Sequence, residues 1–318
     1  MRVNTPLAKA QKLFCCVLLA VTLMCLFLEF VYLPPVYPPP RPVPPKTFIT
    51  CECEYERRLG NLMFTYASML GIARRNNMTP ILVRENKLSE IFDLHCAMSD
   101  DMENTLGRHV SYEEYGRRGS AYDRNTERLV HANTRLLGYF QSFKYFENVA
   151  DTVRANFQFK ESIGHKADEF LSSSHQAEWH DFIRVGIHVR RGDMIEEYFQ
   201  RFGYSVAPVD YFLNAMEYFT SRFQRVRFIV CSDDIDWSRE NIVGENVVYS
   251  IGHSQEIDLA ILSRCDHVIM SVGSFSWWAA WLANGTTIYY DKWPRPFTQL
   301  EYNVNKFEYF PRHWIPMH

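Results

Sequence analysis

Between residues 182 and 193 the chain reads FIRVGIHVRRGD, with isoleucine or valine at every second position of its first part. This period of two is typical of a β-strand with one buried face, and it predicts that the strand ends just before Arg190, Arg191 and Asp193. Ligands of open α/β sheets bind beyond the carboxyl ends of the strands, where a guanidinium can hold two phosphate oxygens. The pattern therefore indicates an anion site. The plainer alternative is a surface salt bridge between Arg191 and Asp193, beside a buried, hydrogen-bonded His188.

After this strand, short apolar runs alternate with stretches of helical periodicity. The runs predict strands at residues 226–231, 247–249, 267–271 and 286–290, and the periodic stretches predict helices at 209–223, 255–263 and 277–282. Strands that alternate with helices indicate parallel βαβ units. Residues 181–318 are therefore predicted to form a Rossmann-like half.

The preceding part of the chain begins with a similar pattern. Strands are predicted at residues 47–53 and 80–83, and the apolar residues between Leu59 and Ala73 recur at helical spacing. Gly60 would allow a sharp turn from strand into helix, and the free N–H groups near Asn61 could then face a ligand. An ordinary packed turn is the alternative interpretation.

Three further stretches complete this first half. Residues 100–128 are polar and charged without clear periodicity, which predicts a loop or an insertion. Residues 136–146 are rich in aromatic side chains and predict a buried connector into a helix that runs through residue 157. A second polar stretch, residues 161–181, is predicted to mark the boundary between a first half at 47–180 and the second half at 181–318.

The first 46 residues have a different composition. Residues 13–28 carry no charge, and the apolar run continues to residue 33 with only Glu29 in it. As a helix such a run spans about 30 Å, the thickness of a bilayer core, and it is longer than the apolar part of most cleaved signal peptides. Basic residues precede it, so the positive-inside rule predicts a type II orientation, with the large domain on the luminal or extracellular side. The segments predicted are a cytoplasmic tail at 1–12, a transmembrane anchor at 13–33 and an extended proline-rich stem at 34–46.

Composition narrows the choice of partners and compartment. The chain of 318 residues has a net charge of −3, which argues against a nucleic-acid partner. Of its eight cysteines, three lie in the predicted anchor, and the other five leave at least one without an intrachain partner in an oxidising compartment. Cys231 and Cys265 adjoin apolar strands and are predicted to be buried thiols. Asn77 and Asn284 begin glycosylation sequons, although Asn284 also suits the end of a helix.

Two more predicted strand ends carry candidate chemistry. The segment SDDIDW after the strand at 226–231 places Asp233 beside a D-x-D pair, Asp234 and Asp236. Such a pair can hold a divalent metal against a diphosphate, but an aspartate directly before a helix is also an ordinary N-cap.

The segment SVGSFSWW after the strand at 267–271 opens a helix with small hydroxylated residues. Backbone N–H groups and hydroxyls around Ser274, Phe275 and Ser276 could cradle a phosphate, with plain helix capping as the alternative. Asp258, on the helix predicted at 255–263, could reach the same crevice or lie on the surface.

Together these segments resemble the α1,2-fucosyltransferase family of animals and bacteria. GNLMFTYA at residues 60–67 is similar to the family's GNQMFxYA, and GYFQSFKYF at 138–146 is similar to its middle signature. VGIHVRRGD at 185–193 matches an H-x-R-R-x-D segment that α1,6- and protein O-fucosyltransferases share. FIVCSDDIDW at 228–237 and SVGSFSWWAAWLA at 271–283 follow in the family's order and spacing. Leu62 departs from the pattern, because the family usually has glutamine there.

The resemblance implies an α/β fold of GT-B type, with two Rossmann-like halves that face a cleft, preceded here by a single N-terminal transmembrane helix. GDP-fucose would bind mainly to the C-terminal half, with Arg190 on the β-phosphate, and no metal or other cofactor would be required. The residues implied to bind the donor are Gly60, Asn61, His188, Arg190, Arg191, Asp233, Asp234, Asp258, Ser274, Phe275 and Ser276.

The resemblance also implies transfer with inversion, to the 2-hydroxyl of a terminal galactose in a glycan, at the Golgi membrane. A carboxylate that takes the proton of that hydroxyl would assist, and Asp193, Glu196 and Glu197 lie just past the arginines. Two alternatives stay open. One is a metal-dependent glycosyltransferase of GT-A type that uses Asp234 and Asp236, and the other is a membrane-tethered glycan-binding protein without turnover.

Overall fold

The computed structural model describes residues 6–32, 46–52, 57–114, 119–173 and 181–318, which fall into two separate units, Met1–Pro45 and Lys46–His318. The first unit contains helix α1 (Pro6–Tyr32). Among the residues described, no helix combines the length and the apolar character needed to cross a bilayer. The transmembrane anchor predicted at residues 13–33 is therefore not confirmed. Most of the predicted stem at 34–46 lies outside the described residues.

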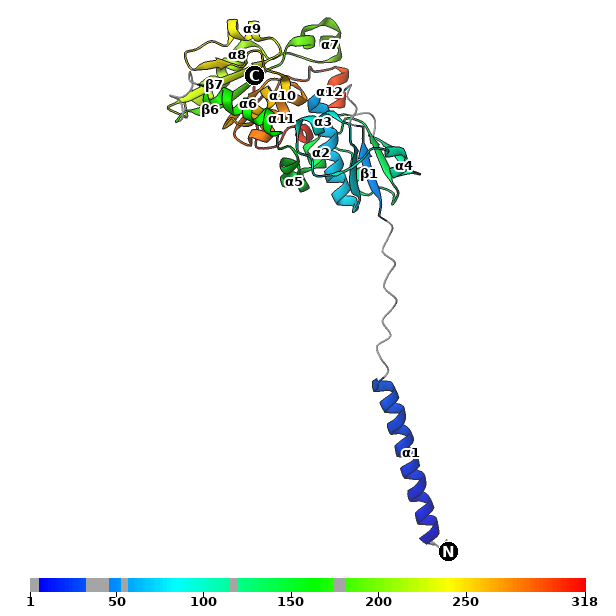
Figure 1. The fold of residues 1–318 in the computed structure, drawn as a ribbon. Coiled ribbons are helices and arrows are strands. Elements are labelled where there is room, and N and C mark those ends of the chain that lie inside the picture. Colours follow the sequence, from blue (N-terminus) through cyan, green and yellow to red (C-terminus); the bar gives the residue numbers. More distant parts are fainter. Residues whose placement is uncertain (1–5, 33–45, 53–56, 115–118, 174–180) are drawn as a thin grey trace. The chain divides into compact units, whose positions relative to one another are not determined.

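The unit Lys46–His318 contains two parallel sheets, and Figure 1 shows their elements in two lobes, with α2, β1 and α4 in one and β6, β7, α8 and α9 in the other. The first sheet has the order β3-β2-β1-β5-β4, and each neighbouring pair is parallel. Its strands are β1 (Phe48–Cys51), β2 (Thr79–Val83), β3 (Ala97–Ser99), β4 (Val110–Glu113) and β5 (Thr134–Leu137).

The second sheet has the order β11-β10-β9-β6-β7-β8, again with parallel neighbours. Its strands are β6 (Ile183–Val189), β7 (Val226–Ser232), β8 (Val247–Tyr249), β9 (His267–Met270), β10 (Thr287–Tyr290) and β11 (Ile315–Met317). The chain moves outward from β6 to β7 and β8, then returns to β9 and moves outward in the other direction. The strand order therefore reverses between β6 and β9, which is the usual place of a ligand site in such sheets. The Rossmann-like topology predicted for this half is confirmed.

The helices lie between and around these strands. They are α2 (Leu59–Asn76), α3 (Lys87–Ile91), α4 (Met102–Leu106), α5 (Ala150–Asn156), α6 (Glu161–Ser172), α7 (Glu197–Phe202), α8 (Val209–Thr220), α9 (Ile235–Asn241), α10 (Gln255–Ser263), α11 (Gly273–Ala283), α12 (Gln299–Asn303) and α13 (Lys306–Tyr309). Short 3-10 helices occur at Arg124–Glu127, Phe143–Tyr145, Glu147–Val149 and Gly192–Ile195.

Two polar stretches are more ordered than their sequences indicate. Residues 100–128, predicted to be a loop, contain α4 and the edge strand β4. Three of the four β4 residues are exposed, so the strand has no apolar alternation and depends on its pairing with β5. The stretch 161–181, predicted to be a boundary, contains α6, which packs against α10 of the second half.

Helices α2 and α11 form the core between the two halves. Both are apolar on nearly all sides, as expected for helices that are covered on all sides. The Phe64 ring centroid lies 4.6 Å from that of Trp277 and 5.1 Å from that of Trp278. Leu62, which departs from the family pattern, is fully buried here. Cys231 and Cys265 are buried as predicted, whereas Cys53 lies outside the described residues.

The C-terminal segment returns to the first half. The N–H of Asn305 donates to the Ser120 carbonyl oxygen at 2.9 Å, and the Ser142 hydroxyl donates to the Glu308 carbonyl oxygen at 2.6 Å. The Lys144 ammonium lies 3.1 Å from the Glu308 carboxylate. Residues 303–309 therefore pack against the half that precedes them in sequence, although the sequence pattern groups them with the second half.

Candidate functional site

A cavity of about 720 Å³ is lined by residues that follow the carboxyl ends of strands in both sheets. From the first half, the residues that follow β1 and β5 line it, including Arg58, Gly60, Asn61, Tyr139 and Gln141. From the second half it is lined by residues at the carboxyl ends of β6, β7 and β9, including His188, Arg190, Asp233, Ser274 and Phe275. In the second sheet, β6 and β9 flank the point where the strand order reverses, and β7 is the neighbour of β6. The cavity is large enough for a nucleotide-sized ligand.

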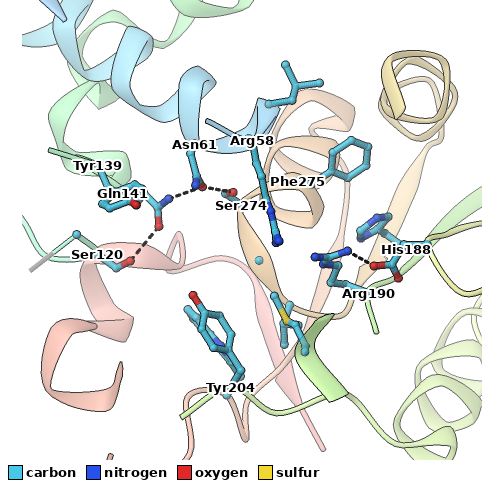
Figure 2. Close-up of a pocket in the computed structure, with 18 of the residues that line it drawn as sticks. Arg58, Asn61, Ser120, Tyr139, Gln141, His188, Arg190, Tyr204, Ser274 and Phe275 are labelled. Atoms are coloured by element: carbon cyan, nitrogen blue, oxygen red, sulfur yellow. Dashed lines mark hydrogen bonds and ion pairs between the residues drawn. The ribbon is translucent and has the colours of Figure 1, made fainter. Parts of the chain in front are cut away.

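A chain of hydrogen bonds crosses the cavity from one half to the other (Figure 2). The Ser274 hydroxyl donates to Asn61 Oδ1 at 2.6 Å, and Gln141 Nε2 donates to the same oxygen at 2.7 Å. The Ser120 hydroxyl in turn donates to Gln141 Oε1 at 3.2 Å. Asn61 is therefore held by groups from both halves, and its side chain has a fixed orientation in the wall of the cavity.

Gly60 allows the two core helices to meet at their first turns. A Cβ atom on Gly60 would lie 2.6 Å from the backbone nitrogen of Phe275 and 2.6 Å from the carbonyl carbon of Ser274. Neither α2 nor α11 has a side-chain cap on its N-terminal N–H groups. Because free N–H groups and the helix dipole favour negative charge, two uncapped helix ends at one cavity suit an anion such as a diphosphate.

His188 is a neutral hydrogen-bond acceptor at the cavity. The Ser276 hydroxyl donates to the Val272 carbonyl oxygen at 3.1 Å, and with that bond in place the Nδ1–H group of His188 is the donor in its contact with Ser276. That leaves Nε2 as an acceptor. Burial, together with the nearby Arg190 charge, lowers the pKa of His188 to about 3, so the ring is neutral at physiological pH. Phe275 packs on the ring at 4.7 Å.

The buried His188 should make the protein less stable in mild acid. An unfolded histidine has a pKa of about 6.5, and the folded value is about 3. Between these values the unfolded chain binds a proton that the folded chain does not, so stability is lost as pH falls. From pH 7 to pH 5 the loss through His188 is about 2 kcal/mol. Urea unfolding at pH 7 and pH 5 gives the difference in unfolding free energy between the two pH values. In His188→Gln this difference should be smaller than in wild type by about 2 kcal/mol. An equal pH dependence in wild type and variant would contradict it.

Arg190 joins a charged cluster that spans the halves. Its guanidinium contacts the carboxylates of Asp233 and Asp193, and Arg58, from the first half, contacts Asp193 as well. The backbone N–H of Arg190 donates to the Ser271 hydroxyl at 2.9 Å. Burial raises the pKa of Asp193, but the hydrogen bond from Arg58 and the charge of Arg190 outweigh it and lower the pKa. A carboxylate with a lowered pKa is a weak base, so this environment suits positioning of Arg190 more than proton abstraction.

Comparison with known proteins identifies the family. Residues 44–315 match the model of the family described as glycosyl transferase family 11. The chain belongs to this family. It is 30% identical over 245 residues to galactoside alpha-(1,2)-fucosyltransferase 1 of Lagothrix lagotricha, covering 73% of this chain and 65% of that protein. It is 29% identical over 249 residues to galactoside alpha-(1,2)-fucosyltransferase 2 of Sus scrofa, covering 75% and 71%. The alignment thus spans a little less than two thirds of the length of the first of these relatives.

The solved structure of NodZ alpha-1,6-fucosyltransferase, soaked with GDP-fucose, resembles the family 11 chain in fold. The TM-score is 0.50 at 14% sequence identity, covering 77% of this chain and 95% of that one. With the two parallel sheets, this likeness supports the GT-B-like α/β fold expected from the sequence. The resemblance to α1,2-fucosyltransferases is confirmed by the family match.

The second arginine of the family 11 motif lies outside the cavity. Arg191 Nε lies 3.1 Å from Asp234 Oδ2, and the guanidinium stacks 4.0 Å over the Trp237 ring. Both arginines follow the end of β6, and Arg191 is the residue directly before the 3-10 helix Gly192–Ile195, with a φ of −129° and a ψ of −64° that are not those of a strand. Asp234 caps α9 by accepting from the Trp237 N–H at 3.3 Å, so it has the N-cap role that the sequence left open.

The remaining acidic candidates are scattered. Asp258 lines the cavity, accepts from the Ser250 hydroxyl at 2.5 Å and has its pKa raised by burial. Glu196 and Glu197 are exposed and do not line the cavity, and Glu197 pairs with Arg201 at 2.5 Å. Asp236 is exposed. Across the ranges that the structure describes, no three His, Cys, Asp or Glu side chains gather in a way that could hold a metal.

Several cavity residues were not predicted. Gln141 belongs to the segment GYFQSFKYF, whose resemblance to the family could have pointed to it, whereas Arg58 lies two residues before GNLMFTYA. Tyr204 and His253 lie in loops without a motif, and only the fold brings them to the cavity. Ser276 was predicted to line the diphosphate, but it lies behind His188 and fixes the orientation of that ring.

Both sequon asparagines end helices in the left-handed conformation, Asn77 with a φ of 53° and Asn284 with a φ of 61°. Asn284 Oδ1 also accepts from an Arg154 guanidinium nitrogen at 2.8 Å, so this residue has a structural role. Both side chains are exposed. Glycosylation at either position stays a prediction.

Proposed function

We propose that the cavity binds GDP-fucose and that the protein transfers fucose, with inversion, to the 2-hydroxyl of a terminal galactose. The observation that carries this proposal is the position of Arg190 at the reversal point of the second sheet, in the same cavity as two uncapped helix ends. The names of the family 11 relatives support the choice of reaction and acceptor.

The charges of the site suit the departure of GDP. As the bond between fucose and the β-phosphate breaks, negative charge grows on the phosphate oxygens, and a positioned arginine stabilises that charge most in a cavity with little water. The N–H groups at the starts of α2 and α11 would add to this effect. His188 Nε2 would accept a hydrogen bond from the guanosine, since a neutral histidine with Nδ1 protonated offers an acceptor there.

The proton of the acceptor hydroxyl needs a destination. In the part of the cavity that the structure describes, the lining carboxylates are Asp233 and Asp258. Asp193, Glu196 and Glu197 remain the residues predicted from sequence, and only Asp193 contacts a residue of the cavity wall.

The variants Glu196→Gln and Glu197→Gln test the two glutamates as the general base. If one of them takes the proton, its glutamine variant should have a kcat about a hundredfold lower and an unchanged affinity for GDP. Normal turnover in both would remove them.

Transfer should be insensitive to excess EDTA, because Arg190 and the helix ends supply the charge that a metal would supply in a GT-A enzyme. The measurement is the initial rate of GDP formation with and without the chelator. Loss of activity with EDTA, restored by manganese, would favour the metal-dependent alternative that uses Asp234 and Asp236.

Release of GDP tests the proposal itself. With GDP-fucose and lactose, the protein should form GDP continuously, and omission of lactose should reduce the rate strongly. A protein that binds lactose and leaves GDP-fucose intact would be the glycan-binding alternative instead. This assay therefore separates an enzyme from a lectin.

Attachment to the Golgi membrane belongs to the same proposal. Its support is the uncharged stretch at residues 13–28, preceded by the basic residues Arg2, Lys9 and Lys12. Expression of the full chain in animal cells, followed by carbonate extraction and protease protection, would test it. We expect the protein to stay with the membrane pellet and the large domain to be protected; release into the supernatant would contradict attachment.

A further inference from the structure

A second cavity, of about 340 Å³, adjoins the first. Val304 lines both cavities, and Ser120 lines the first while its neighbour Ala121 lines the second. The wall of the second cavity consists of Glu114, residues 121–125, Tyr302, Asn305 and Glu308. It thus lies between the first half and the C-terminal segment, and its volume is in the range of small-ligand sites, about 300–1,000 Å³.

Glu114 carries a buried oxygen that the protein leaves without a partner. The residue is 3% exposed, and its Oε2 accepts the N–H groups of Tyr139 at 3.0 Å and Phe140 at 3.1 Å. Within the described residues, Oε1 has no hydrogen-bond partner. The Tyr145 hydroxyl lies close enough to Glu114 to lower its pKa, and it donates to the Ala121 carbonyl oxygen at 3.2 Å. A buried acceptor without a donor is costly, and a ligand hydroxyl would remove that cost.

Other polar groups of this cavity already have protein partners. Asp123 Oδ1 accepts the Asn125 N–H at 3.0 Å and its Oδ2 accepts the Tyr112 hydroxyl at 2.6 Å. Glu308 accepts the Tyr122 N–H at 2.9 Å and pairs with Lys144. Glu114 is therefore the acceptor that is left for a ligand among the carboxylates that line the described wall. Burial raises its pKa to about 7, so it is largely ionised at pH 8.

The lining indicates a neutral, hydroxyl-rich ligand. Three carboxylates and one guanidinium, that of Arg124, line the cavity, so an anion would be repelled. Tyr302 lines the cavity and is 64% exposed. A carboxylate that accepts hydrogen bonds from hydroxyl groups, beside an accessible aromatic ring, is suited to binding a sugar.

We propose that the second cavity is the subsite for the sugar that precedes the terminal galactose in the acceptor, and that Glu114 accepts a hydrogen bond from one of its hydroxyls. The inference rests on the proposed function, since it needs the galactose to sit beside the donor in the first cavity. A glycan whose end reaches that cavity past Ser120 and Val304 continues into the second. The subsite takes neutral sugars and rejects carboxylated ones.

Glu114→Gln tests the hydrogen bond. The amide oxygen can still accept the two backbone N–H groups, while the other position becomes a donor. With the full chain at pH 8, KM for lactose should rise about tenfold, and kcat, KM for GDP-fucose and KM for phenyl β-D-galactoside, which has one sugar, should not change. Glu113→Gln is the matched control, because Glu113 is the exposed neighbour on the opposite face of β4. Circular dichroism and melting temperature should confirm that both variants fold.

Charge gives a second readout. Lactitol and lactobionate both carry galactose on an open-chain sugar, and only lactobionate is anionic. Wild type should have a KM for lactobionate at least about tenfold above that for lactitol at pH 8, and the ratio of the two KM values should be smaller in Glu114→Gln.

The aromatic ring is tested separately. Tyr302→Ala should raise KM for lactose without changing KM for phenyl β-D-galactoside. Phe307→Ala is its control, because Phe307 is 83% exposed and does not line either cavity.

The outcomes are distinguishable. Transfer by wild type, with unchanged KM for lactose in both Glu114→Gln and Tyr302→Ala, would overturn the subsite and leave the proposed function standing. Equal losses for lactose and phenyl β-D-galactoside would also overturn it, because they would indicate a general structural role. Absence of GDP release by wild type with any galactoside would overturn both proposals.

Discussion

Arg190→Lys should lower kcat for fucose transfer by about a hundredfold or more, while circular dichroism and melting temperature stay close to wild type. Lysine keeps the charge and loses the planar fork. If Arg190 holds two oxygens of a phosphate that gains charge in the transition state, loss of one donor costs about 3 kcal/mol. The side chain is 21% exposed, so it is shielded enough from water for this effect to persist.

The control for this prediction is Arg201→Lys. Arg201 pairs with Glu197 on the surface, where both side chains are more than three-quarters exposed, and such pairs are worth about 0–1 kcal/mol. Its kinetics should equal those of wild type. If Arg190→Lys also had wild-type kinetics, Arg190 would be one more charge in an ion-pair cluster, and the best physical reason for a nucleotide-sugar donor at this strand end would be lost.

Gly60→Ala should have the second largest effect, because it acts on the contact between the halves. The added Cβ would lie 2.6 Å from backbone atoms of Ser274 and Phe275, and backbone of a helix start has little room to move. We expect the unfolding free energy to fall by about 2 kcal/mol or more, whereas alanine in place of a helical glycine usually raises it. Displacement of Ser274 and Asn61 by a few tenths of an ångström or more should lower kcat/KM by about a hundredfold.

Gly164→Ala provides the comparison for this variant. Gly164 also lies in a helix, α6, and the nearest contact of an added Cβ is the flexible end of the Arg264 side chain at 3.0 Å. Urea unfolding should show it as stable as wild type or up to about 1 kcal/mol more stable, with normal kinetics. Equal behaviour of the two glycine variants would mean that the first turns of α2 and α11 are not in tight contact in solution.

The second half of the fold was predictable because short apolar runs alternate there with stretches of helical periodicity. Strand β8 and helix α10 have the predicted bounds, and Arg190 follows the end of β6 as the alternation of apolar residues requires. The position of Arg191 was not predictable in this way, because the chain leaves the extended conformation after β6. Gly60, Asn61, His188, Asp233, Asp258, Ser274 and Phe275 were all predicted as donor-binding residues and all line the cavity.

The parts that were not predictable depend on contacts between distant segments. Strand β4 has no apolar face of its own, and its place at the edge of the sheet is set by β5. Glu114 follows β4 in a polar stretch, and nothing local indicates that the backbone of Tyr139 and Phe140 closes over it. Residues 303–309 leave their own half to pack on the first, which only the three-dimensional arrangement of α12 and α13 reveals.

The structure of the product tests the central claim most directly. The protein should be incubated with GDP-fucose and lactose, and the trisaccharide that forms should be analysed by proton NMR. A single product with α-linked fucose on O2 of galactose is expected, with GDP released in equal amount. A β-linked fucose, a fucose on another hydroxyl, or GDP-fucose that stays intact would contradict it.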